Sequence, residues 1–145
     1  ALFPASPKAA AAPGPAEPAA EWRGSGAVLV ADDEQTIREV TAHMLRALGF
    51  TALTAANGRE ALEAFRAHQG EIACVILDLT MPELSGEETF RELRLLDPAV
   101  RVIITSGYNE QEVTQHFAGK GLAGFMQKPY QMAVLRATLR EALKA

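Results

Sequence analysis

The feature that most constrains the fold is a regular alternation of two hydrophobic patterns from Ala27 to the end of the chain. Short apolar runs of strand length alternate with segments whose apolar residues recur every three or four positions, as on one face of a helix. The apolar runs are residues 27–31, 51–55, 72–77, 100–105 and 123–126. Helical spacing follows each of them, around Ile37, Leu62, Phe90, Val113 and Leu135. The pattern therefore predicts five successive β–α units.

This alternation specifies an α/β fold class. Strands that alternate with helices form a parallel sheet with helices on both faces, and right-handed crossovers restrict the topologies available. Five such units favour a flavodoxin-like, doubly wound (βα)5 fold, which is a three-layer sandwich around a five-stranded parallel sheet of order 2-1-3-4-5. In such a sheet the functional site lies at the carboxyl ends of strands 1 and 3.

The first 24 residues differ from the rest of the chain in composition. Residues 1–20 contain nine Ala and five of the eight Pro, and Gly24-Ser25-Gly26 follows. Such a segment buries too little apolar surface to offset the entropy of ordering it. We expect residues 1–24 to be a linker or tail and residues 25–145 to be the folded domain.

Composition excludes several classes of function. The net charge is −4 and Lys and Arg form no cluster, which argues against nucleic-acid binding by electrostatics. No apolar run approaches the length of a membrane span, so no membrane contact by this chain is expected. The single cysteine, Cys74, excludes a disulfide framework and fits a buried core residue in a reducing, cytoplasmic setting.

Polar residues capable of chemistry follow four of the five expected strands. Asp32 and Asp33 follow the first, Asp78 the third, Ser106 the fourth and Lys128 the fifth. Because the carboxyl ends of parallel strands share one edge of a sheet, these side chains should converge. Three of the four Asp residues of the chain would then lie at one site.

Three neighbouring carboxylates repel one another by about 1–4 kcal/mol per pair at about 4 Å, so packing alone does not explain them. One of Asp32 and Asp33 could cap the first helix, but a cap does not account for all three. A bound Mg²⁺ does, since it takes carboxylate oxygens and waters as ligands. With Lys128 as a second cation, the set suits phosphoryl transfer, in which Asp78 is the candidate nucleophile and Ser106 could donate a hydrogen bond to a phosphoryl oxygen.

Four segments carry a resemblance to a known family. They are VLVADDE (28–34), LDLTMPELSG (77–86), ITSGY (104–108) and FMQKPY (125–130). Together they resemble the receiver domain of two-component response regulators, over essentially the whole globular part of the chain. The resemblance implies that Asp78 accepts a phosphoryl group from a phosphohistidine. It also implies that Asp33 and Asp78 bind Mg²⁺ directly, Asp32 through water, and Thr80 through its backbone carbonyl.

The resemblance implies roles for other residues as well. Lys128, followed by a cis Lys128–Pro129 bond, should form an ion pair with the phosphoryl group. Ser106 and Phe125 match the hydroxyl and aromatic switch pair, which would change the surface around the fourth helix, fifth strand and fifth helix. Thr80 and Tyr108 match positions that border the path of the attacking water, and the bulk of Tyr108 leads to the hypothesis of slow phosphoryl hydrolysis.

The expected function is therefore a phosphoacceptor switch and not an enzyme in its own right, with a histidine kinase domain or a histidine-phosphotransfer domain as partner. Two alternatives were weighed. A docking module that is never phosphorylated is disfavoured by the intact set of site residues. A haloacid-dehalogenase-like phosphatase would need a second Asp two residues after Asp78, where this chain has Thr80.

The parent protein is a separate question. Residues 2–5, Leu-Phe-Pro-Ala, resemble the closing strand of a histidine-kinase ATPase domain. Together with the sequences of the segments ITSGY and FMQKPY, this resemblance suggests the C-terminal receiver of a bacterial hybrid sensor histidine kinase. The parent chain could be membrane-anchored. The alternative is a free-standing regulator with an N-terminal extension.

Overall fold

A computed structural model of the chain describes residues 26–79, 85–107, 117 and 121–143. Its strands are β1 (Ala27–Ala31), β2 (Thr51–Ala55), β3 (Ile72–Asp78), β4 (Val102–Ser106) and β5 (Gly124–Gln127). Its helices are α1 (Gln35–Ala47), α2 (Gly58–Ala67), α3 (Gly86–Leu96) and α5 (Met132–Ala142). The fourth helix expected around Val113 and the linker of residues 1–24 lie outside the described residues.

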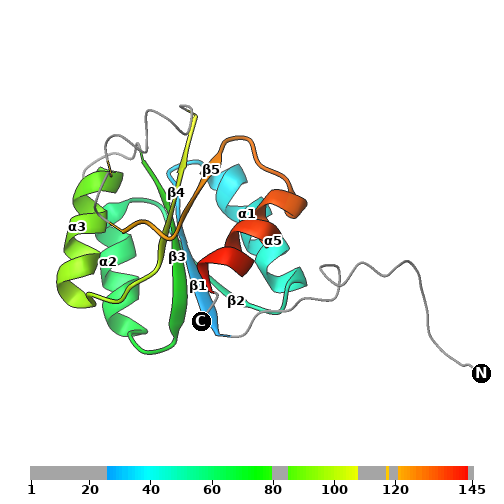
Figure 1. The fold of residues 1–145 in the computed structure, drawn as a ribbon. Helices are drawn as coiled ribbons and strands as arrows, with labels where there is room; N and C mark the ends of the chain where they lie inside the picture. Colours follow the sequence, from blue (N-terminus) through cyan, green and yellow to red (C-terminus); the bar gives the residue numbers. More distant parts are fainter. Residues whose placement is uncertain (1–25, 80–84, 108–116, 118–120, 144–145) are drawn as a thin grey trace, which may run out of the picture.

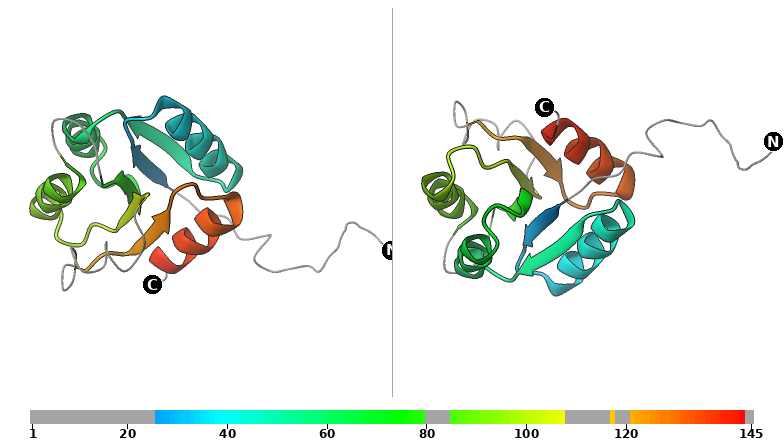
Figure 2. Two further views of the ribbon diagram at one scale, coloured as in Figure 1. Left: turned by 90° about the horizontal axis from the view of Figure 1, so that it is seen from above. Right: turned by 90° about the horizontal axis from the view of Figure 1, so that it is seen from below.

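The sheet has the predicted topology. All strand pairs are parallel and their order is β2-β1-β3-β4-β5. Helices α2 and α3 cover one face of the sheet, and α1 and α5 cover the other, so that three layers are visible in Figures 1 and 2. The flavodoxin-like arrangement is confirmed.

The bounds of three strands differ from the prediction. β3 extends one residue further, because Asp78 pairs with Thr105 of β4. β4 begins at Val102 instead of residue 100, since the Val100 amide donates to the Asp97 carbonyl and closes a turn before the strand. β5 likewise begins and ends one residue later, at Gly124 and Gln127. Apolar character alone does not locate the first residue that joins the ladder.

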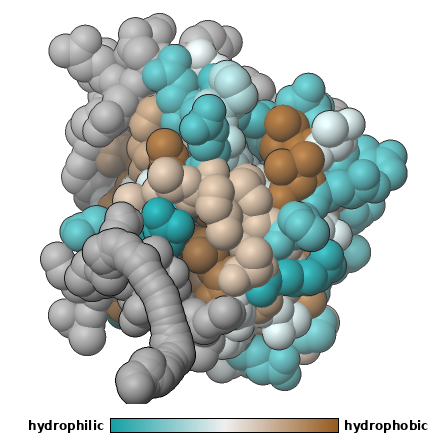
Figure 3. All heavy atoms as spheres, turned by 90° about the vertical axis from the view of Figure 1, so that its right-hand side faces the viewer, coloured by the Kyte–Doolittle hydropathy of each residue, from teal (hydrophilic) through white to brown (hydrophobic). Residues whose placement is uncertain are grey.

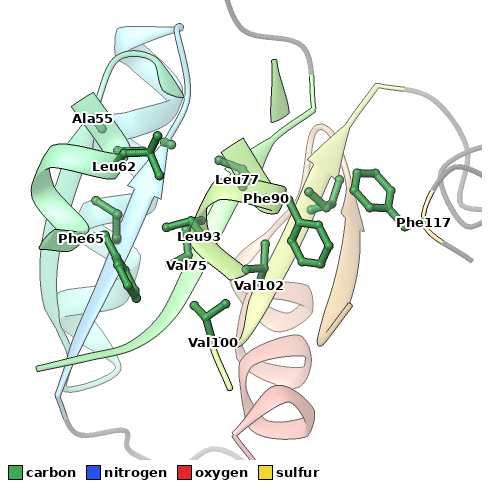
Figure 4. Close-up of a cluster of buried hydrophobic side chains, with 14 residues drawn as sticks. Ala55, Leu62, Phe65, Val75, Leu77, Phe90, Leu93, Val100, Val102 and Phe117 are labelled. Atoms are coloured by element: carbon green, nitrogen blue, oxygen red, sulfur yellow. The ribbon is translucent and has the colours of Figure 1, made fainter. Parts of the chain in front are cut away.

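The core consists of two apolar layers separated by the sheet. Along β1, Leu29 and Ala31 point into the layer beneath α2 and α3, whereas Val28 and Val30 point toward α1 and α5. Figure 4 shows the first of these layers. Every residue of β1 is buried, which explains an unbroken apolar run in place of an alternating one. Cys74 of β3 is a fully buried core residue, as expected, and burial raises the pKa of its thiol to about 12.

Some apolar surface remains outside the core. Val40 of α1 and Val134 of α5 are 51% and 45% exposed. Figure 3 views the side on which these two helices lie, where apolar surface is mixed with hydrophilic side chains. Among the described residues, no helix is long and apolar enough to cross a membrane.

Candidate functional site

The carboxyl ends of four strands bring the predicted polar residues together. Asp32 directly follows β1, Asp78 is the last residue of β3, Ser106 is the last of β4 and Lys128 directly follows β5. The parallel register places Ala31 beside Leu77, and Asp78 beside Thr105. Side-chain contacts bring Asp32, Asp78 and Lys128 together at this edge, and the end of β4 places Ser106 at the same edge.

Asp32, Asp33 and Asp78 form a compact acidic cluster. One carboxylate oxygen from each lies within 4.8 Å of the other two. Asp32 and Asp78 are each only 2% exposed, whereas Asp33 is exposed to solvent. Two buried acids and one exposed acid form a set of oxygen ligands that is open to solvent on one side.

Asp32 is held by several hydrogen bonds, one of them from its own amide to the Ala55 carbonyl at 3.1 Å. Its Oδ1 accepts the Glu34 amide at 2.9 Å, and its Oδ2 lies 2.9 Å from Lys128 Nζ. Its backbone carbonyl accepts Arg38 Nη1 at 2.7 Å. The suggestion that Asp32 or Asp33 caps α1 is wrong, because the N-cap residue is Glu34 and Asp32 instead closes the turn that precedes the helix.

Lys128 is surrounded by three carboxylates. Its Nζ lies 2.9 Å from Asp32, 3.3 Å from Glu34 and 3.5 Å from Asp78. Burial by itself would lower the pKa of Lys128, but the hydrogen bond to Asp32 and the charge of Asp78 raise this pKa overall. The lysine is therefore charged at physiological pH. The Lys128–Pro129 bond is cis, as the resemblance implies.

Asp78 has an unusual electrostatic environment. Burial raises its pKa to about 7, the neighbouring charges of Asp32 and Asp33 contribute in the same direction, and Lys128 opposes them. Its buried Oδ1 receives no hydrogen bond from any described residue, since 3.5 Å to Lys128 is an ion-pair distance beyond ordinary hydrogen-bond length. With only the ion pair to Lys128 in contact, this carboxylate oxygen can serve as a ligand or as a nucleophile, and the acidic cluster fits a hard divalent ion.

The two residues of the predicted switch pair lie on neighbouring strands, Ser106 on β4 and Phe125 on β5. Ser106 is 2% exposed, and its backbone carbonyl accepts the Lys128 amide at 2.8 Å. Phe125 of β5 is half-buried and packs against the apolar layer beneath α2 and α3. Thr80 and Tyr108, expected to border the water path, lie outside the described residues.

Sequence reasoning missed four contributors to the site. Arg38 and Glu34, described above, contact Asp32 and Lys128. Tyr130 exchanges a 2.7 Å hydrogen bond with Thr41 of α1, which ties the segment after Lys128 to that helix. Helical spacing placed Thr41 on the buried face of α1, but no local signal links two residues that are 89 positions apart.

Gly86 is the fourth contributor, and its role is steric. It is the first residue of α3, and a Cβ atom there would lie 2.5 Å from the carbonyl oxygen of Asp78 and 2.6 Å from the Cα of Leu79. Only a residue without a side chain permits the start of α3 to approach the end of β3 so closely. Gly86 thus fixes the backbone that carries Asp78.

We expect Gly86→Ala to lower the free energy of unfolding by about 1–3 kcal/mol, the usual range for overpacking, because backbone atoms cannot yield as a flexible side chain would. Chemical denaturation would measure the change. Gly107→Ala is the matched control, since a Cβ atom there meets nothing within 4 Å. Equal unfolding free energies for the two variants would show that the backbone around Gly86 accommodates a Cβ atom without loss of stability.

Comparison with known proteins identifies the family. The description "Response regulator receiver domain" matches residues 28–140. The chain belongs to this family. It is 35% identical over 128 residues to the sensor kinase CckA of Brucella abortus, covering 88% of this chain but 14% of that protein. It is 30% identical to the chemotaxis protein CheY of Thermotoga maritima, covering 81% of this chain and 97% of that one.

Solved structures agree with this assignment. The receiver domain of the hybrid histidine kinase CckA superimposes with a TM-score of 0.69 at 30% identity, covering 82% of this chain and all of that one. A CheX–CheY complex from Borrelia burgdorferi that contains BeF3 and Mg²⁺ superimposes with a TM-score of 0.76 at 28% identity, covering 83% of this chain and 90% of that one. The chain spans 14% to 31% of the first four curated relatives that it matches.

Family membership and the acidic cluster together establish the general function. The chain is a phosphoacceptor receiver domain of two-component signalling, of the CheY type. It is a signalling module. The haloacid-dehalogenase and docking-module alternatives are not favoured.

Proposed function

We propose that Asp78 is the phosphoacceptor and that transfer from a phosphohistidine to it requires Mg²⁺. The carrying observation is the buried Asp78 Oδ1, which receives no hydrogen bond from the described residues although it lies among Asp32, Asp33 and Lys128. In this reaction Oδ1 forms a bond to phosphorus while the bond from phosphorus to the donor imidazole breaks. The histidine leaves with the bonding electron pair.

The same cluster supplies the ligands for Mg²⁺. Asp33 and Asp78 would bind it directly, Asp32 through water, and the backbone carbonyl of Thr80 would complete the protein ligands. The exposure of Asp33 and the burial of Asp32 are consistent with this division, because an ion at the open side of the cluster meets Asp33 first. Bound Mg²⁺ supplies neutralisation of the negative charge shared by the carboxylates and the phosphoryl oxygens.

Lys128 and Ser106 act on the phosphoryl group once it is attached. Lys128 neutralises one of its oxygens, and the Ser106 hydroxyl donates a hydrogen bond to another. Phe125 then moves into the space that the Ser106 side chain leaves, which alters the surface around the fourth helix, β5 and α5. Phosphorylation would thus select one of two conformations.

The chain also fits a place within a larger phosphorelay protein. Similarity to CckA and to its receiver domain supports a hybrid sensor histidine kinase as the parent. A histidine kinase domain or a histidine-phosphotransfer domain would then be the phosphodonor, acting in the cytoplasm.

Mass spectrometry tests the proposal directly. The purified chain is incubated with acetyl phosphate and Mg²⁺, and the phosphorylated peptide is located after proteolysis. We expect one phosphoryl group on the peptide that contains Asp78, and none when Mg²⁺ is removed by a chelator. Labelling that persists in the chelator, or that maps to the Asp97 peptide, would contradict the proposal.

A further inference from the structure

We propose that Glu34 is a positioning residue that holds Lys128 away from Asp78 and thereby slows phosphoryl uptake. This inference rests on the proposed function, because it assigns a regulatory role at the same site. It concerns a residue outside the acidic cluster that sequence reasoning left without a role.

The first observation is that Glu34 occupies a helix N-cap position without capping the helix. N-cap side chains are normally Ser, Thr, Asp or Asn, whose short side chains reach back to the first amides. The longer Glu34 side chain makes no such bond. It extends instead to Lys128, 94 residues away in the sequence, with its Oε1 at 3.3 Å from Nζ. The Glu34 amide donates a hydrogen bond to the Asp32 carboxylate, which fixes the backbone from which the Glu34 side chain extends.

The second observation is the order of the three distances at Lys128. Its ammonium lies closest to Asp32, at 2.9 Å, and next to Glu34, at 3.3 Å, while Asp78 is the farthest carboxylate at 3.5 Å. Asp78 Oδ1 receives no hydrogen bond from the described residues. The lysine charge is therefore drawn to the side of the site where Glu34 lies, away from the atom on which the phosphoryl group would form.

The third observation is that the Glu34 contact is weak enough to be released. The Glu34 side chain is 64% exposed, whereas that of Asp32 is 2% exposed. Exposed ion pairs contribute little and are screened by salt. Glu34 thus competes with the phosphoryl group for Lys128 without holding the lysine permanently, and the expected effect on the rate of uptake is roughly twofold to fivefold.

A second explanation must be separated from this one. The negative charge of Glu34 near the acidic cluster could simply repel an anionic phosphodonor. Glu34→Asp separates the two, because it keeps the charge but shortens the side chain by one methylene, so that contact with Lys128 is lost. Glu34→Gln removes the charge. Glu39→Gln is the matched control, since Glu39 is an exposed acid of α1 that contacts Gln35 and not Lys128.

The experiment measures the rate of Mg²⁺-dependent labelling by acetyl phosphate in the full chain and its three variants. We expect Glu34→Asp and Glu34→Gln both to be about twofold to fivefold faster than the unaltered chain, and Glu39→Gln to match it. The ratio of the labelling rate of Glu34→Asp to that of the unaltered chain should fall toward one as salt rises to about 0.5 M, because screening releases the lysine in the unaltered chain. A purely structural effect of the substitution would not depend on salt in this way.

Two results would overturn the inference while the proposed function stands. One is labelling of Glu34→Asp at the rate of the unaltered chain with Glu34→Gln faster, which would assign the effect to donor repulsion. The other is no acceleration in either variant. If the unaltered chain is not labelled on Asp78 at all, the proposed function fails, and the inference fails with it.

Discussion

Asp78→Asn is expected to abolish phosphoryl incorporation while making the metal-free domain more stable at neutral pH. An amide of nearly the same shape cannot act as the nucleophile, so labelling by acetyl phosphate should fall to background. The same change removes a buried charge that faces Asp32 and Asp33, while Lys128 keeps Asp32 and Glu34 as partners. Loss of function with gain of stability distinguishes a functional residue from a structural one.

The pH dependence of this gain follows from the raised pKa of Asp78. That pKa rises from 3.8 to about 7 on folding, so between these values the native state holds a proton that the unfolded state has released. Native stability therefore falls as pH rises through this range, and the penalty is complete above pH 7. At pH 8 we expect the free energy of unfolding of Asp78→Asn to be higher than that of the unaltered chain by a few kcal/mol, on the order of 10 °C in Tm. Near pH 4 the difference should be much smaller.

Thermal unfolding in chelator, at several pH values, measures this difference. Asp97→Asn serves as the control, because Asp97 is the one aspartate of the chain outside the acidic cluster and lies at the end of α3. The gain should also disappear when Mg²⁺ is added, since the ion neutralises the carboxylates that repel one another. A stability gain that is independent of pH would show that desolvation and charge repulsion at Asp78 are not its source.

Lys128→Met should have the opposite effect on stability. Lys128 is the cation that faces two carboxylates of 2% exposure, and its removal takes away the ammonium that lies 2.9 Å from Asp32 and 3.5 Å from Asp78. Breaking a buried ion pair on one side costs about 3–5 kcal/mol, and we expect the lower end because Lys128 itself is 16% exposed. The deficit should be largest above pH 7 and smaller near pH 5, where protonation of Asp78, whose pKa is raised to about 7, removes one of the unpaired charges.

Chemical denaturation in chelator measures the deficit, and Mg²⁺ provides an internal check. With the lysine charge removed, the acidic cluster should bind Mg²⁺ more tightly, so that the ion restores more stability to Lys128→Met than to the unaltered chain. Lys128→Arg, which keeps the positive charge, should lose much less stability in chelator than Lys128→Met. Unaltered stability of Lys128→Met in chelator would show that Lys128 is not the main counter-charge of Asp32 and Asp78.

Sequence reasoning was most successful where a pattern reports burial directly. The unbroken apolar runs of β1 and β3 correspond to strands buried on both faces, and the observed order of the strands is the one favoured for five β–α units. The convergence of Asp32, Asp78, Ser106 and Lys128 then follows, because each lies at the carboxyl end of a parallel strand. Strand ends were less well predicted, since hydrogen bonds such as that from Val100 to Asp97 determine them.

The sequence by itself thus determined the fold class, the strand order and the group of residues at the site, because hydrophobic periodicity and the position of a polar residue after a strand are local properties. Only the tertiary structure decided how those residues share their charges. Lys128 lies closer to Asp32 and Glu34 than to Asp78, Gly86 touches the backbone of Asp78, and Tyr130 bonds to Thr41. Each of these contacts joins residues from different parts of the fold. The distances between them depend on how helices and strands pack, and periodicity along the chain does not encode such distances.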